Sequence, residues 1–303
     1  MPVRNEAAGL AAAVQSVLAQ EYPVRFDVCL AVAPSDDATE AIAQQLAAAD
    51  SRVTVVANPS GATPAGLNAA IRATAGAVVV RVDGHARLSP GYIRRAVETM
   101  RRTGAVNVGG VQAAVGETPF ERAVATAMTS WLGTGGARFH VGGAEGPVDT
   151  VYLGVFDRAA GDAVGWFDER LIRNQDYELN IRLRAAGGTI WFDPELSVTY
   201  RPRSTVRALA RQYFEYGQWK AEVLRRHPES LKLRQAAPAA LPVALAGALL
   251  AGARWRPALL VPIAYAMLVA TAAKRRPRVA LAAATMHVAW GVGFQARMLR
   301  GRR

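Results

Sequence analysis

Two side chains that can bind a metal ion, Asp83 and His85, flank one glycine directly after a mostly apolar stretch, residues 78–82. We expect that stretch to be a buried strand, with both side chains at its carboxyl end. An acidic residue and a second ligand one residue apart can face a divalent ion that bridges diphosphate oxygens and neutralises their charge. Imidazole is a softer ligand than carboxylate and also suits manganese. The alternative is a strand-terminal Asp that only caps the next turn.

A second carboxylate with two competing roles is Asp176, in the segment 174–178. This segment leads into an amphipathic helix that we expect over 179–186, closed by Gly187 and Gly188. A carboxylate at the start of a helix is a common N-cap, which stabilises the helix by about 1 kcal/mol. It could equally be a general base aimed at a cleft. The local sequence leaves both roles open.

The elements that must position these side chains alternate between strand-like and helix-like patterns over the first 200 residues. Apolar runs at 26–33, 53–57 and 77–82 each follow a helical stretch. This alternation indicates an α/β sheet with parallel strands in its core. In such a sheet the chemistry lies in loops at the carboxyl ends of strands. Loops of this kind follow the three runs, at residues 34–37, 58–61 and 83–85.

The first strand of this sheet is nearly absent. The chain opens with the six residues Met1 to Glu6 and then enters a helix expected over 7–19. A strand usually has about five residues. We therefore expect an unusually short first strand, or a start that is truncated or mis-assigned.

Charge divides the chain at about residue 200. Residues 1–200 hold 17 Lys and Arg against 21 Asp and Glu, a net of −4, whereas residues 201–303 hold 19 against 3, a net of +16. The basic part also contains uncharged runs at 236–253, 257–273 and 279–294, close to the ~20 residues that cross hydrocarbon. Basic charge among apolar runs indicates a membrane and not nucleic acid. The alternative is a soluble bundle of buried Ala-rich helices.

The arrangement in the membrane follows from loop charge. The loop with Arg254 and Arg256 is the poorest in charge, so it should be external, making the first two runs a hairpin. The third run carries His287 and Trp290 centrally, and we leave open whether it spans or lies in the interface. The single Cys29 excludes a disulfide framework, and no cleavable signal opens the chain. We expect a plasma-membrane protein with a cytoplasmic catalytic domain.

The order and spacing of several short motifs resemble glycosyltransferase family 2, over about two thirds of the chain. Within that family the chain is most similar to the succinoglycan-biosynthesis type, which has Asp-x-His in place of Asp-x-Asp and is followed by membrane helices. The matching segments are residues 2–6, 16–23, 35–39, 66–71, 83–85, 165–169, 175–178, 201–203 and 211–219.

The resemblance implies a GT-A fold, with a mixed, mostly parallel sheet, and an inverting, hexosyltransferase-like transfer from a nucleoside-diphosphate sugar. By position, it implies that Asp83 and His85 hold Mg²⁺ or Mn²⁺ and that Asp176 is the catalytic base. The nucleotide-sugar pocket would be lined by Asp83 together with Pro2, Arg4, Glu6, Ser35, Asp37 and Asn68. The family usually carries an Asp shortly before the Ser of the second loop, where this chain has Val32 and Ala33. Nucleotide choice therefore does not follow from the family pattern.

The segment after the catalytic part is basic and aromatic. Arg211, Gln212 and Trp219 are candidates to bind the pyrophosphate and first sugar of a lipid-linked or glycan acceptor, because Arg pairs well with phosphate. An interfacial helix whose aromatic residues only anchor it is the alternative.

These interpretations divide the chain into a catalytic domain at 1–200, an interfacial linker at 201–235 and a membrane region at 236–303. The lead hypothesis is an active transferase. The alternative is a catalytically silent membrane protein that binds a nucleotide sugar or scaffolds a partner enzyme. Two features favour this alternative: the very short first strand and the missing Asp of the second loop.

Overall fold

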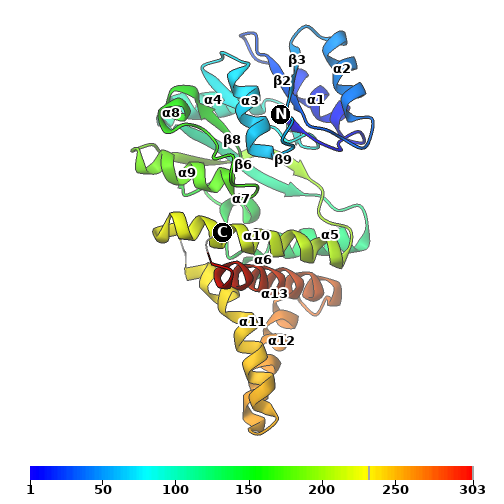
Figure 1. Ribbon diagram of the computed structural model, residues 1–303, viewed down its shortest axis with the longest axis vertical. Coiled ribbons are helices and arrows are strands. Elements are labelled where there is room, and N and C mark those ends of the chain that lie inside the picture. The colour runs from blue at the N-terminus through cyan, green and yellow to red at the C-terminus, as the bar shows by residue number, and fades with distance from the viewer. Residues whose placement is uncertain (231–232, 302–303) are drawn as a thin grey trace. The chain divides into compact units, whose positions relative to one another are not determined.

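The computed structural model of the chain describes residues 1–230 and 233–301 (Figure 1). Residues 231–232 of the expected linker, and 302–303 at the end of the expected membrane region, lie outside the described residues. The contacts divide the chain into two compact units: residues 1–113 with 142–200, and residues 114–141 with 201–303. One boundary between the units lies after residue 200, and the insert at 114–141 groups with the C-terminal part.

The first unit opens with a three-stranded parallel sheet in the order β1-β2-β3. The strands are β1 (Pro2–Val3), β2 (Val28–Val32) and β3 (Val53–Ala57), and the helices that follow them are α1 (Leu10–Leu18), α2 (Thr39–Ala49) and α3 (Thr63–Arg72). The expected α/β alternation is confirmed, as is the very short first strand. The helix expected over 7–19 is shorter, at Leu10–Leu18.

A second, six-stranded sheet has the order β4-β8-β6-β9-β5, with β7 paired to β9. Its strands are β4 (Val78–Val80), β5 (Arg87–Leu88), β6 (Asn107–Ala114), β7 (Gly146–Val148), β8 (Tyr152–Asp157) and β9 (Ile190–Tyr200). The pairs β4–β8, β6–β8, β5–β9 and β7–β9 are antiparallel. The parallel arrangement therefore holds for the first three strands, and the fold as a whole is mixed. The helices α4 (Tyr92–Thr103), α8 (Arg158–Val164) and α9 (Gln175–Ala185) complete this unit.

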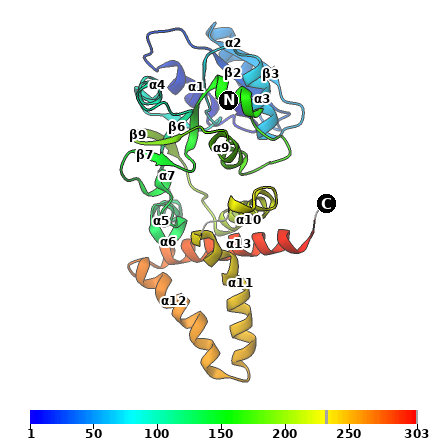
Figure 2. The same ribbon diagram turned by 90° about the vertical axis from the view of Figure 1, so that its left-hand side faces the viewer.

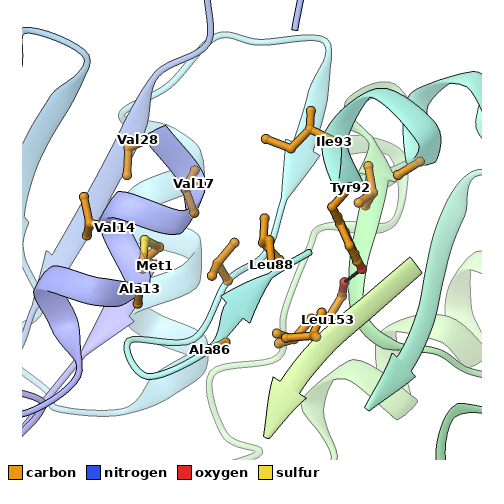
Figure 3. Close-up of a cluster of buried hydrophobic side chains, with 14 of the residues drawn as sticks. Met1, Ala13, Val14, Val17, Val28, Ala86, Leu88, Tyr92, Ile93 and Leu153 are labelled. Atoms are coloured by element: carbon orange, nitrogen blue, oxygen red, sulfur yellow. Dashed lines mark hydrogen bonds between the residues drawn. The ribbon is translucent and has the colours of Figure 1, made fainter. Parts of the chain in front are cut away.

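One apolar cluster joins the two sheets of the first unit (Figure 3). Ala13, Val14 and Val17 on α1 face Leu88 of β5, and Tyr92 and Ile93 at the start of α4 extend the cluster toward β8. The Tyr92 hydroxyl is buried and donates to the carbonyl oxygen of Leu153 at 3.3 Å. Apolar burial of this extent fixes where the loops after β1 and β4 lie, because both strands contribute to the cluster.

The second unit is helical. It contains α5 (Pro119–Met128), α6 (Trp131–Thr134), α7 (Arg138–Val141), α10 (Val206–Arg226), the 3₁₀ turn η1 (Pro228–Ser230), α11 (Leu233–Gly252), the 3₁₀ turn η2 (Arg256–Leu259), α12 (Leu260–Ala272) and α13 (Pro277–Leu299). In both views α10 lies against α13 (Figures 1 and 2). Two glycines permit this approach: a Cβ on Gly217 would strike the backbone of Trp290, and one on Gly293 would strike the backbone of Phe214. The helix α5 also packs on α13.

The helices α11 and α12 form a hairpin, as expected from the first two apolar runs (Figure 2). By length and composition, two of the described helices could cross a membrane, at Gln235–Gly252 and Pro277–Leu299. In the most apolar 18-residue window of each helix, 11% of the residues are buried in the first and 39% in the second. Large apolar side chains are exposed along the hairpin, among them Leu250, Leu260, Ile263 and Met267.

Candidate active site

The loops that follow β1 and β2 are tied together by backbone N–H groups of the first loop. The amide of Asn5 donates to Ser35 Oγ at 3.1 Å, and the amide of Ala7 donates to Asp37 Oδ2 at 3.1 Å. The pKa of Asp37 is lowered, chiefly because the Thr39 hydroxyl donates to its carboxylate. Ser35 and Asp37, both expected in the nucleotide pocket, therefore hold the β1 loop in place in this structure.

Pro2 and Arg4 lie beside the loop that follows β3. A Cβ on Gly61, which has a φ of 68°, would lie 3.2 Å from Arg4 Nη1, and one on Gly66 would lie 3.2 Å from the Cβ of Pro2. Glycine is the residue that adopts a positive φ without a steric cost. The two glycines thus allow the loop after β3 and the start of α3 to approach Pro2 and Arg4 closely.

Asn68, on α3, binds another part of the first unit. Its amide nitrogen donates to the carbonyl oxygen of Phe167 at 2.8 Å and to Glu169 Oε1 at 2.9 Å, and its amide oxygen accepts from the Phe167 amide at 3.1 Å. The side chain is buried. Both ends of its amide are thus engaged with the segment 165–169, so the structure links two of the sequence motifs through this residue.

Asp83 lies after β4 and pairs with Arg81. Nε and Nη2 of Arg81 lie 3.3 and 3.1 Å from Asp83 Oδ1. Burial by itself raises the pKa of Asp83, but the Arg81 guanidinium, together with His85, holds that pKa below its usual value. Asp83 is therefore ionised at neutral pH, as a metal ligand or a phosphate-facing carboxylate has to be.

His85 lies against Glu6. Its Nδ1 is 2.8 Å from Glu6 Oε1, which connects the loop after β4 to the loop after β1. The glycine between Asp83 and His85 allows this approach, since a Cβ on Gly84 would lie 2.9 Å from the Glu6 side chain. Glu6, expected in the nucleotide pocket, is thus in contact with the expected metal ligand.

Asp176 is in the first turn of α9 and is not its N-cap. Asn174 occupies the cap position, with a φ of 59° and no side-chain capping bond. Asp176 Oδ1 accepts from the amide of Tyr177 at 2.9 Å, and Oδ2 lies 3.6 Å from Arg81 Nη1. The N-cap interpretation of Asp176 is therefore wrong, because the helix begins two residues earlier than that role requires.

The residues after β4 offer the kinds of donor atom that a divalent cation accepts. Among the residues that the structure describes, no group of three or more His, Cys, Asp and Glu side chains is arranged to hold a metal. Magnesium, however, is usually held by one or two protein carboxylates together with water and substrate phosphates. An ionised Asp83, and the His85 imidazole whose Nδ1 lies against Glu6, are ligands of the kinds that such a partial site uses, since a carboxylate commonly orients a metal-binding His.

Arg211, Gln212 and Trp219 lie on α10 in the second unit. Gln212 Nε2 donates to the Tyr216 hydroxyl at 2.9 Å, and Tyr213 packs edge-on against Tyr216 with ring centroids 5.6 Å apart. Arg211 is exposed at an apolar groove of about 450 Å³ between α10 and α13, lined by Phe214, Val288 and Val292 among others.

Comparisons with known proteins identify the family of this chain. The family model described as "Glycosyl transferase family 2" matches residues 1–165. The chain is 33% identical to "Succinoglycan biosynthesis protein ExoA" of Rhizobium meliloti (strain 1021), over all of this chain and 95% of that protein. The chain therefore belongs to glycosyl transferase family 2 and is a glycosyltransferase.

Solved structures show the same fold. A mannosyltransferase, PcManGT from Pyrobaculum calidifontis in complex with GDP-Man and Mn²⁺, superposes with a TM-score of 0.74 at 17% identity, over 99% of this chain and 86% of that one. A structure of GalNAc-T7 with UDP, GalNAc and Mn²⁺ superposes with a TM-score of 0.52 at 15% identity, over 76% of this chain and 49% of that one. The expected GT-A fold is thereby confirmed.

One residue of the site escaped the sequence analysis, namely Arg81. It contacts both Asp83 and Asp176 and is itself buried. A signal was available: Arg81 stands inside the run Val78 to Val82, and an Arg on a buried strand is rare unless it is paired.

Proposed function

We propose that this chain is an inverting, metal-dependent glycosyltransferase. It moves a sugar from a nucleoside-diphosphate sugar to a lipid-linked or polysaccharide acceptor at the inner face of the plasma membrane. The observation that carries the proposal is that Asp83 and Asp176, far apart in sequence, contact the same buried guanidinium of Arg81. This shared contact supports placing a donor-side carboxylate and a candidate base in one site.

Asp83 and His85 would hold the cation, and Glu6 would orient His85 by accepting from its Nδ1–H. A bound cation would neutralise charge on the diphosphate. The Asn5 and Ala7 amides, fixed by Ser35 and Asp37, keep Glu6 between them in position. Arg4 is exposed beside this loop and would meet the nucleotide phosphates as a bidentate donor.

Asp176 would take the proton of the acceptor hydroxyl. Inversion requires a base on the face of the sugar opposite the leaving diphosphate, so a base and a donor-side charge centre have to face one cleft. The carboxylate of Asp176 remains about one third exposed, at 34%, which leaves it accessible to an acceptor. Its role as a base is supported further by the loss of the alternative N-cap role.

Membrane attachment is supported by the second unit. The exposed apolar side chains of the α11–α12 hairpin form the kind of surface that soluble monomers rarely expose. We place α13 in the interface, because α10, α11 and α5 already cover part of it. The name of the Rhizobium relative, a succinoglycan biosynthesis protein, supports a role in polysaccharide synthesis. Arg211, Gln212 and Trp219 remain our candidates for the acceptor.

Donor screening with the detergent-solubilised full chain tests the proposal. The assay follows nucleoside diphosphate release from UDP- and GDP-linked hexoses with a bacterial lipid extract as acceptor, and transfer of labelled sugar into the organic phase. We expect one donor to be consumed, with an inverted anomeric configuration in the product. Donor binding without any transfer would instead support the silent binder.

A further inference from the structure

Arg81 is buried more completely than its charge would normally allow. Its exposed fraction is 8%, and Nη1 makes no hydrogen bond although it is inaccessible to solvent. Its backbone amide donates to the Gly154 carbonyl oxygen at 3.1 Å, which fixes the residue against β8. A buried charge has to be compensated by partners, or the fold is destabilised.

The partners of Arg81 come from two different elements. Nε and Nη2 contact Asp83, two residues further along the same segment, at 3.3 and 3.1 Å. Nη1 faces Asp176 Oδ2, at the start of α9, at 3.6 Å. The guanidinium is planar and rigid, so contacts at two of its edges fix the separation and direction of the two carboxylates.

The electrostatic surroundings agree with this arrangement. Burial lowers the pKa of Arg81, but Asp83 and Asp176 raise it above its usual value, so the side chain stays charged. Burial also raises the pKa of the neighbouring Tyr152 well above its usual value, which leaves that hydroxyl neutral. The charge of Arg81 is thus balanced by the two carboxylates.

We propose that Arg81 is a positioning residue that holds the base carboxylate of Asp176 at a set distance and direction from the donor-side carboxylate of Asp83. This inference rests on the proposed function, since it uses the roles given there to the two Asp residues. A residue that only neutralises buried charge could be replaced by any cation of similar length. A residue that sets geometry could not, because an ammonium is a single point that cannot bind at two edges.

The test combines Arg81→Lys and Arg81→Gln with Asp176→Asn in the full chain. Turnover is measured at saturating donor. Donor affinity is judged from the affinity for the nucleoside diphosphate, which is measured by titration. We expect Arg81→Lys to lower turnover about 10- to 100-fold, as misplacement of a reacting group by about 1 Å does, with donor affinity within a few-fold of the parent. In the Asp176→Asn background, we expect Arg81→Lys to change turnover less than about two-fold, because the base it positions is already gone.

Arg95→Lys is the matched control. Arg95 also pairs with a buried Asp of the same unit, Asp193, at 2.8 Å, and its second ion-pair partner is Glu195, which is not a candidate site residue. We expect it to lower the melting temperature without changing turnover. Arg81→Gln, which removes the charge, should lower turnover at least as much as Arg81→Lys.

Three results would overturn the inference. If Arg81→Lys lowers turnover by the same factor in the parent and in the Asp176→Asn background, Arg81 acts independently of the base. In that case only this inference fails. If Arg81→Lys folds and keeps full turnover, the geometry of the guanidinium is not needed for catalysis. If Asp176→Asn alone transfers sugar like the parent, the base assignment in the proposed function fails, and the positioning role fails with it.

Discussion

Nδ1 of His85 lies 2.8 Å from Glu6 Oε1, so a residue before α1 contacts the metal-ligand candidate after β4. A carboxylate that accepts from one nitrogen of a metal-binding His fixes the ring and strengthens the ligand, and its loss typically costs 10- to 100-fold in metal affinity. We therefore expect Glu6→Gln to raise the Mn²⁺ concentration for half-maximal activity by about 10-fold or more. Activity titrated with Mn²⁺ measures this. Glu40→Gln, at an exposed position on α2, is the control, and equal metal dependence of the two variants would contradict the arrangement.

Removal of the metal should stop diphosphate release. A chelator is expected to abolish activity, and Mn²⁺ or Mg²⁺ added in excess should restore it. Asp83→Ala should also weaken donor binding, because the cation that would balance the charge of the diphosphate loses a ligand. Isothermal titration with the donor, with and without the metal, checks both effects. Full activity in the chelator would remove the metal from the mechanism.

Asp176→Asn separates catalysis from structure. The variant can still accept from the Tyr177 amide, so the start of α9 should be kept. Loss of a general base lowers turnover by about 10²- to 10⁴-fold. Donor affinity should survive, because the nucleotide and metal contacts come from other loops. Transfer and donor binding are measured on the same preparation. Transfer within a few-fold of the parent would mean that Asp176 is no base.

The hairpin is expected to be the membrane anchor. Truncation after residue 200 should release the protein from membranes, since residues 201–303 hold the excess of 19 basic over 3 acidic residues and every long apolar run. It should also uncover the buried face of α5, which includes Val124 and Met128 and packs on α13, so the product should be poorly active and less stable. Deleting residues 236–273 alone spares α10 and α13. Sedimentation with membranes is compared between the truncated protein and the hairpin-deleted protein. A hairpin-deleted protein that is still found in the membrane fraction would assign the anchor to α10 and α13.

Acid should weaken the first unit through Asp193. Burial raises the pKa of Asp193, but hydrogen bonds from Arg95 and Thr99, at 2.8 and 2.9 Å, make the net change a lowering. A lowered folded-state pKa means that the stabilisation is complete above the ordinary value of 3.8 and is lost as pH falls through the folded-state value. Asp193→Asn should cost about 1.5–3 kcal/mol at neutral pH. Melting temperatures of the parent and the variant are measured from pH 3 to 7, and we expect them to converge at low pH. A constant difference between the two melting temperatures over this range would contradict the prediction.

The local pattern of the sequence was enough to predict several features of this protein. The alternation of strands and helices, the short first strand, the paired Asp83 and His85 and the two-part charge distribution can all be seen without coordinates, because each depends on neighbours in the chain. The order of the motifs indicated the family for the same reason. The antiparallel pairing of β4 with β8 could not be anticipated in this way, since pairing depends on which distant strand lies alongside.

The tertiary structure decided what the site residues touch. Asn68 binds residues near position 167, Glu6 reaches His85, and Arg81 joins Asp83 to Asp176. It also grouped residues 114–141 with the C-terminal helices, through the packing of α5 on α13. Side chains far apart in the chain meet only because apolar burial brings their elements together, and a sequence pattern records which face is buried but not what that face is buried against.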